Sequence, residues 1–149
     1  MQQRQILVAD TDGSLADAFR SCLERLGFDV RTAQSGVECL DRLREMSPDI
    51  LLLERELLWG GGDGVAAVLR ETGPRCRSSV VLMNGSGTPE ECQSLIMPPV
   101  VACLQKPFSL LRLLELPVFA QNLVPGGMRS LLTGGGSKDF GHARHRNRV

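Results

Sequence analysis

The stretch that decides the fold is Pro48-Asp49-Ile50-Leu51-Leu52-Leu53-Glu54. Four aliphatic residues follow one another in it, and an acid, Glu54, ends the run. A strand that is apolar on consecutive positions is typical of the centre of a parallel sheet, where helices cover both faces. The sequence therefore predicts a buried strand over 49–53, with Glu54 at its carboxyl end.

Short strand-like runs alternate with stretches of helical periodicity on both sides of this strand. Strands are predicted at 5–9, 28–32, 49–53, 79–83 and 100–104, with amphipathic helices between them. This alternation indicates an α/β fold, in which a doubly wound parallel sheet of five strands carries helices on both faces.

Two of the helices have recognisable boundaries. Ser35 can cap the second helix, which is predicted to direct three apolar residues toward the core, namely Val37, Leu40 and Leu43. The last helix is predicted over 108–119, and Pro117 should end or kink it early because proline cannot continue the hydrogen-bond ladder.

The composition fits one ordinary globular domain. The chain has 149 residues, of which 42% are hydrophobic and 23% charged, enough for a core of its own. Basic and acidic residues balance at 17 each, so net charge does not indicate nucleic acid or a membrane as a partner. No apolar run approaches the roughly 18 residues that span a bilayer, and a cytoplasmic location is expected.

The cysteines are five in number and none forms a CxxC pair: Cys22, Cys39, Cys76, Cys92 and Cys103. Most lie inside apolar patterns, where a reduced cysteine packs as a small hydrophobic side chain. The sequence therefore predicts neither a disulfide framework nor a zinc site.

A change of composition divides the chain near residue 121. The part over 4–121 is predicted to form the domain, whereas 122–149 is rich in glycine and contains five basic residues and one acid, Asp139. Such a composition cannot bury a core, which predicts a disordered basic tail. His142 and His145 within it are a conceivable metal pair, but an unstructured tail is the better interpretation.

Polar residues close the predicted strands. In an open α/β sheet the functional groups lie beyond the carboxyl ends of the strands. The candidates after the first, third, fourth and fifth strands are Asp10, Thr11 and Asp12, then Glu54, then Asn84, and finally Lys106-Pro107-Phe108. Lys106 is one of only two lysines, against fifteen arginines.

This set of residues resembles the receiver domain of response regulators in two-component signalling, over residues 4–121. The resemblance implies a flavodoxin-like sheet with strand order 2-1-3-4-5. It also assigns roles to positions. Glu54 stands where the family has its phosphate-accepting aspartate, and Cys103 stands where it has an aromatic switch residue. Asp10, Thr11 and Asp12 replace the acidic pair that binds magnesium, while Asn84 and Lys106 occupy the positions that contact the phosphoryl group.

The chain departs from the family at most of these positions. The Glu54 carboxylate lies one methylene, about 1.5 Å, further from the backbone than an aspartate, and in-line phosphoryl transfer tolerates little misplacement. Thr11 offers a hydroxyl where magnesium, a hard ion, prefers a carboxylate, and Asp12 is displaced by one position. We therefore expect no catalytic residue, and no cofactor beyond weak Mg²⁺ binding.

Three functions are compatible with this pattern. The first is a stand-alone atypical receiver that does not accept phosphate and acts as a protein-binding module rather than an enzyme. The alternative is a working phospho-acceptor with an unusual acidic site. In the first case Glu54 beside Lys106 would partly imitate a phosphorylated receiver, although a solvated structural ion pair is equally compatible. The third is weak binding of nucleic acid or an acidic partner through the tail.

The resemblance implies a partner surface on the fourth helix, fifth strand and fifth helix, about residues 92–114. The run over 95–101 is unusually apolar, and a histidine kinase and a second copy of the chain are the candidate partners. The glycine loop over 60–64 lacks the lysine and hydroxyl of a P-loop, so it predicts a flexible connection. Trp59 should lie exposed at its start, as a partner contact or folded back on the helix.

Overall fold

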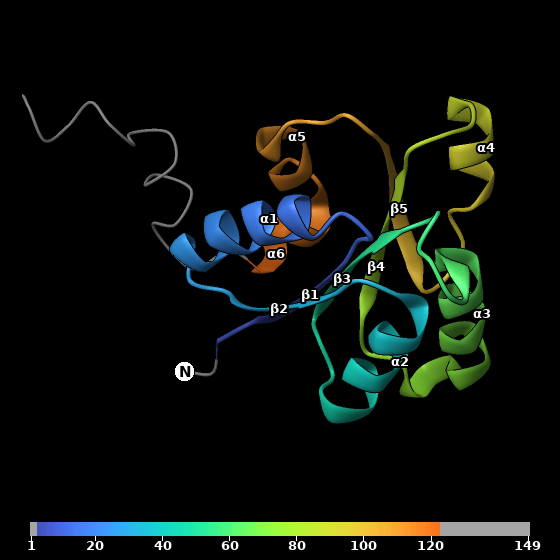
Figure 1. Ribbon diagram of the computed structural model, residues 1–149, viewed down its shortest axis with the longest axis horizontal. Helices are drawn as coiled ribbons and strands as arrows, with labels where there is room; N and C mark the ends of the chain where they lie inside the picture. The colour runs from blue at the N-terminus through green and yellow to red at the C-terminus, as the bar shows by residue number, and fades with distance from the viewer. Residues whose placement is uncertain (1–2, 123–149) are drawn as a thin grey trace, which may run out of the picture.

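The computed structural model describes residues 3–122, which form one five-stranded parallel sheet flanked by helices (Figure 1). The strand order is β2-β1-β3-β4-β5, so the predicted fold class and strand order are confirmed. The predicted strand bounds are shifted by no more than one residue. The strands are β1 (Gln5–Ala9), β2 (Asp29–Ala33), β3 (Ile50–Glu54), β4 (Ser79–Asn84) and β5 (Val100–Gln105).

The helices lie in two layers (Figure 1). On one face of the sheet are α1 (Gly13–Arg25), α5 (Leu110–Leu114) and α6 (Pro117–Asn122). On the other face are α2 (Gly36–Glu45) and α3 (Gly61–Thr72), which continues into the short helix η1 (Gly73–Arg75), while α4 (Pro89–Ser94) packs beside β5. Among the described residues, no helix is long and apolar enough to cross a membrane.

The position of β3 at the centre of the sheet explains why its sequence is apolar at consecutive positions. Ile50 and Leu52 belong to the core cluster under α1, α5 and α6, whereas Leu51 and Leu53 belong to the cluster under α2 and α3. All four are fully buried. Burying each such side chain stabilises the fold by roughly 1.5–3 kcal/mol relative to leaving it exposed, so β3 ties both layers to the sheet.

The prediction for α2 is correct at its start and wrong at one core position. The Ser35 hydroxyl accepts a hydrogen bond from the Glu38 amide, as an N-cap does. Val37, however, is 59% exposed, and Cys39 is fully buried instead. Because the helix begins at Gly36, the face toward the sheet is set by positions three and seven residues further on, and Val37 lies off that face.

The last predicted helix is divided at Pro117, as expected. The structure has a first segment, α5, capped by Ser109, and a second segment, α6, that starts at the proline itself. Proline is tolerated there because the first amide of a helix has no intrahelical partner. The predicted tail over 122–149, including His142 and His145, lies outside the described residues apart from Asn122.

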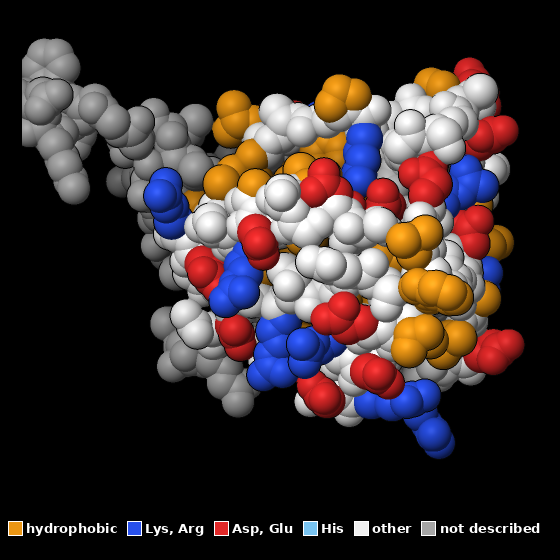
Figure 2. All heavy atoms as spheres, in the orientation of Figure 1, with side chains coloured by type: hydrophobic (Ala, Val, Ile, Leu, Met, Phe, Trp, Pro, Cys, Tyr) orange, Lys and Arg blue, Asp and Glu red, His pale blue; other side chains and the backbone are white. Residues whose placement is uncertain are grey.

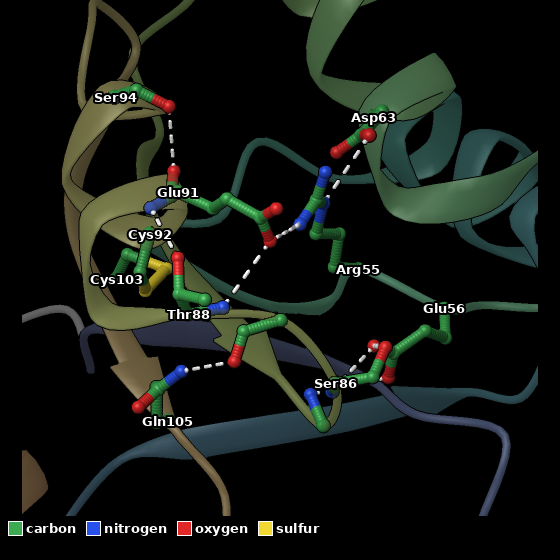
Figure 3. Close-up of a disulfide and its surroundings, with 12 residues drawn as sticks. Arg55, Glu56, Asp63, Ser86, Thr88, Glu91, Cys92, Ser94, Cys103 and Gln105 are labelled. Carbon is green, nitrogen blue, oxygen red and sulfur yellow. Dashed lines mark hydrogen bonds and ion pairs between the residues drawn. A yellow bond between two sulfur atoms is a disulfide. The ribbon is translucent and has the colours of Figure 1, made fainter.

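The cysteine prediction requires a correction. Cys92 of α4 and Cys103 of β5 form a disulfide, with their Cα atoms 5.6 Å apart (Figure 3). The pairing arises because α4 lies along the edge strand, which is a tertiary contact that the spacing of the cysteines does not reveal. Cys22, Cys39 and Cys76 are free thiols, as expected.

Candidate functional site

The candidate site lies where β1, β3, β4 and β5 end. The Lys106 ammonium lies 2.6 Å from an Asp10 carboxylate oxygen and 3.2 Å from one of Glu54. Asp10 is fully buried, and the Glu54 and Lys106 side chains are 12% and 19% exposed. Parallel strands present their carboxyl ends at one edge of the sheet, which is why residues almost a hundred positions apart in sequence meet here.

The residues after β1 are held by backbone contacts. The Thr11 amide donates to the second oxygen of Glu54 at 2.7 Å, and the Thr11 hydroxyl accepts from the Leu58 amide at 3.3 Å. Asp12 caps α1, since its carboxylate accepts from the amides of Ser14 and Leu15. Both carboxylate oxygens of Glu54 therefore have a donor within the protein.

The electrostatics of the site follow from one cation between two acids. Burial raises the pKa of Asp10, and the hydrogen bond from Lys106 offsets this only in part, so the pKa stays above its ordinary value. Burial also acts to raise the pKa of Glu54, but hydrogen bonds from Thr11 and Lys106 outweigh it and the pKa falls. Burial lowers the pKa of Lys106, yet its bonds to the two carboxylates raise it above the ordinary value.

Asn84 closes β4 beside this group and is 1% exposed. Within the described part of the chain, neither its amide nitrogen nor its amide oxygen has a hydrogen-bond partner. A buried polar group without a partner costs stability. The resemblance to receiver domains places Asn84 at a position that contacts the phosphoryl group, and that role stays a prediction.

The residues present do not fit the magnesium site that the resemblance implies. Asp12 uses its carboxylate to cap α1, Asp10 is buried against Lys106, and the Thr11 hydroxyl is engaged by Leu58. Magnesium needs hard oxygen ligands in near-octahedral geometry, several of which are usually water. Over residues 3–122, no group of three or more His, Cys, Asp or Glu side chains is placed to hold a metal ion.

The glycine loop is not the flexible connection that was predicted. Gly61 already begins α3, and Gly60 before it adopts a left-handed conformation with φ of 113°. A Cβ atom on Gly62 would collide with the carbonyl oxygen of Glu54 and lie 2.8 Å from the Cα of Arg55. The glycines therefore let the start of α3 pack directly against the end of β3.

Trp59 projects from this loop, as predicted, and its side chain is 77% exposed. Its φ of 54° is a left-handed conformation that a non-glycine residue seldom adopts. Val37 and Leu58 nearby are also more than half exposed, and Figure 2 shows apolar side chains gathered on this side of the molecule. Of the two predicted arrangements for Trp59, the exposure disfavours folding back on the helix.

Three residues cross-link the loops through contacts that were not predicted from the sequence (Figure 3). Glu56 accepts hydrogen bonds from the Gly85 amide and from the amide and hydroxyl of Ser86, which joins the loops after β3 and β4. Arg55 pairs with Asp63 at 3.4 Å and with Glu91 at 4.0 Å. No local signal marks Arg55 or Glu56, because their partners come close only in the fold. Glu91 is part of the helix start that the sequence indicates at Thr88-Pro89-Glu90-Glu91, but its contact with Arg55 is not predictable from that signal.

The predicted partner surface over α4, β5 and α5 is apolar in part. Four large apolar residues on it are exposed, namely Ile96, Met97, Val101 and Leu111, with exposures between 39% and 50%. Val100 and Leu104 are buried, so the apolar run over 95–101 is shared between the core and the surface. Its use as an interface remains a prediction.

Comparison with known proteins identifies relatives by sequence. A family model described as the response regulator receiver domain matches residues 6–116. A protein of Haloferax volcanii is 36% identical over 107 residues, which are 72% of this chain and 17% of that protein. The DNA-binding response regulator MtrA of Mycolicibacterium paratuberculosis is 41% identical over 70 residues, 47% of this chain and 31% of that protein. The chain thus spans less than a third of these relatives.

Solved structures agree on the fold. The signal receiver domain of a DNA-binding response regulator from Colwellia psychrerythraea superposes with a TM-score of 0.68 at 21% identity, covering 74% of this chain and 92% of that one. The chemotaxis protein CheY4 of Vibrio cholerae gives a TM-score of 0.69 at 20% identity, covering 83% and 100%.

Proposed function

Because this chain belongs to the response regulator receiver domain family, whose members act in two-component signalling, we propose that it is a pseudo-receiver, a receiver that does not accept phosphate. In this proposal it is a protein-binding module rather than an enzyme, it works in the cytoplasm, and it needs no cofactor. The DNA-binding activity in the name of the mycobacterial relative is not carried over, since only 31% of that protein is matched.

The observation that carries this proposal is the state of the Glu54 carboxylate. Its two oxygens are held by the Lys106 ammonium and the Thr11 amide, at 3.2 and 2.7 Å. A nucleophilic oxygen must lie in line with the donor phosphorus, and a misplacement of about 1 Å can cost roughly a hundredfold in rate. Thr11 offers a hydroxyl where magnesium prefers a carboxylate, and Asp12 uses its carboxylate to cap α1.

The arrangement supports a fixed, partly active-like form. Glu54 puts one negative charge beside Lys106, where a phosphorylated aspartate would put nearly two together with more acceptor oxygens. The pair is mostly buried, which argues against the alternative of a solvated surface ion pair of little consequence. We therefore propose that Glu54 substitutes permanently for part of the phosphoryl signal.

Family members exchange signals with other proteins such as kinases, and we propose the surface of α4, β5 and α5 for that purpose here. Three of its exposed apolar residues, Met97, Val101 and Leu111, are each more than 45% exposed. A histidine kinase and a second copy of the chain are the two candidate partners. Sedimentation of the parent and of Val101→Glu distinguishes them, with Val37→Glu, at an exposed apolar residue of α2, as the control. A dimer lost only in Val101→Glu identifies the second copy.

The test of the main proposal is intact mass after incubation with acetyl phosphate and magnesium. The parent is compared with Glu54→Asp and with the double variant Thr11→Asp, Glu54→Asp, each first shown to unfold cooperatively in urea. We expect no phosphoryl mass on the parent. Gain in Glu54→Asp assigns the loss to Glu54, and gain in the double variant alone assigns it to both positions.

The opposite result would establish the alternative function. If the parent gains phosphoryl mass and peptide mapping places it on Glu54, the chain is a working phospho-acceptor with an unusual acidic site, and the pseudo-receiver proposal fails. Weak binding of nucleic acid through the basic tail is a separate hypothesis. It predicts an affinity that falls steeply with added salt and binding that is lost on truncation after Pro125.

A further inference from the structure

The disulfide joins two elements of the proposed partner surface. Cys92 lies in α4 and Cys103 in β5, and their Cα separation of 5.6 Å is one at which the bond forms without backbone movement. We propose that Cys92 and Cys103 form a thiol–disulfide exchange site, which dithiols reduce and small disulfides re-form while the protein stays folded. The exchange itself does not depend on the proposed function, whereas its effect on partner binding does.

Cys92 is central to how α4 is held. The helix has six residues, and Cys92 is its only buried one. A helix this short is not stable by its own hydrogen bonds in water, so its position depends on tertiary contacts. With the disulfide formed, α4 is tied covalently to β5. With it reduced, α4 retains the packing of a single thiol and its polar cap.

The bond is also connected to the candidate site from the β5 side. Cys103 lies in β5, and Lys106 follows that strand directly. The Lys106 ammonium then contacts Glu54 at 3.2 Å. A shift of β5 that accompanies opening of the disulfide therefore changes the position of the only cation in contact with Glu54 among the described residues.

A second connection runs from the α4 side (Figure 3). Glu91, the neighbour of Cys92, accepts from the Thr88 amide in the capping box and lies 4.0 Å from the Arg55 guanidinium. Arg55 is the neighbour of Glu54 and its amide donates to the carbonyl of Met83. The disulfide thus closes a ring of contacts that passes through the site on both sides.

The bond is accessible to a small thiol. A pocket of about 360 Å³ is lined by both cysteines, and Phe108 and Arg112 also line it. Cys103 is partly exposed whereas Cys92 is buried, so we expect Cys103 to be the sulfur attacked.

A dithiol would reduce the disulfide between Cys92 and Cys103 in two exchange steps. A thiolate of the dithiol attacks the Cys103 Sγ, the sulfur–sulfur bond breaks, and Cys92 leaves as a thiolate. The second thiolate of the reductant then attacks the mixed disulfide and releases Cys103. The dithiol is oxidised to a cyclic disulfide by two electrons, and each cysteine takes up a proton. In reducing compartments, disulfides that form are usually transient, as this site requires.

The test uses the full chain equilibrated without denaturant in mixtures of reduced and oxidised dithiothreitol, then acid-quenched, unfolded and alkylated. Three of the five cysteines are free in the oxidised form. We expect intact mass to show conversion from three labelled thiols to five in a single step, and peptide mapping to assign the new labels to Cys92 and Cys103. Reduction that occurs only after urea unfolds the chain would overturn the proposal.

Hydrogen exchange measures the coupling to the site. On reduction of the parent we expect faster amide exchange over α4 and over residues 103–106, on the order of tenfold, because α4 loses its covalent anchor. Cys92→Ser should reproduce the reduced parent, and Cys76→Ser, at a free thiol, should not. Unchanged exchange on reduction of the parent refutes the coupling, and that comparison needs no variant. The phosphoryl assay is independent, so either proposal can fail alone.

Discussion

The ammonium of Lys106 lies 2.6 Å from the carboxylate of Asp10, a residue with no exposed surface. The same ammonium serves Glu54, so one positive charge compensates two mostly buried negative charges. The pKa of the fully buried Asp10 is raised. The pKa of Glu54, which also accepts a hydrogen bond from the Thr11 amide, is lowered. The site is therefore held together by Lys106.

Replacing Lys106 with Met should destabilise the protein by about 3 kcal/mol, because removing one partner leaves buried charge without compensation. Urea unfolding at neutral pH measures the change. The control is Arg20→Met, which breaks an exposed pair with Glu24 and should cost less than about 1 kcal/mol. A loss for Lys106→Met no larger than that of the control would show that the site is open to water.

The loss of protein stability at acid pH should include a contribution from Glu54. Its pKa is lowered on folding, so its stabilisation is complete above its unfolded value of 4.5 and is lost as the pH falls through the folded value. The contribution of Asp10 to the pH dependence of stability has the opposite sign. Because its pKa is raised on folding, the folded state binds a proton at a higher pH than the unfolded state does. The stability difference between the parent and Glu54→Gln should therefore shrink on acidification.

Urea midpoints of the parent and Glu54→Gln between pH 7 and pH 3 test this. The control Glu24→Gln alters an exposed acid, and its difference from the parent should stay small throughout. A difference for Glu54→Gln that is constant down to pH 3 would mean that Glu54 has the same pKa in the folded and unfolded chain.

The sheet was predictable because its signals are local. The consecutive apolar residues of β3 and the alternation of element types define the strands, and parallel strands bring their carboxyl ends together, which foretells that Glu54 meets Lys106. Ser35 marks the start of α2, but the face of α2 that packs on the sheet, and with it the exposure of Val37, depends on tertiary contacts. The disulfide of Cys92 depends on where α4 packs, and no pattern within the helix encodes that.

Glycines in α3 offer a matched pair of variants. A Cβ on Gly62 would collide with the carbonyl oxygen of Glu54, whereas nothing lies within 4 Å of a Cβ on Gly64. Gly62→Ala should lose about 2 kcal/mol of stability through forced movement of β3 against α3. Gly64→Ala should gain about 0.5–1 kcal/mol, because alanine is the better helix former. Thermal and urea unfolding of both variants should show changes of opposite sign, and a shared sign would contradict the packing of this turn.

Cys39 should make the protein sensitive to alkali. Burial, with a smaller effect of the charge on Glu38, raises the pKa of the Cys39 thiol from 9.0 to about 12. Above pH 9 the unfolded chain gives up this proton and the folded chain keeps it, so stability falls with rising pH by up to about 1.4 kcal/mol per pH unit. The chain has no tyrosine and only two lysines, so few other groups titrate in this range.

The measurement is the urea midpoint of the parent and of Cys39→Ala from pH 8 to pH 10.5. Cys39→Ala should start about 1 kcal/mol less stable because of the small cavity, and its stability should decline less steeply with pH. Cys22→Ala, at a free thiol that is only partly buried, is the matched control. If Cys39→Ala and the parent decline in parallel, the Cys39 thiol ionises in the folded protein as easily as in the unfolded one, and the interior beneath α2 is open to solvent.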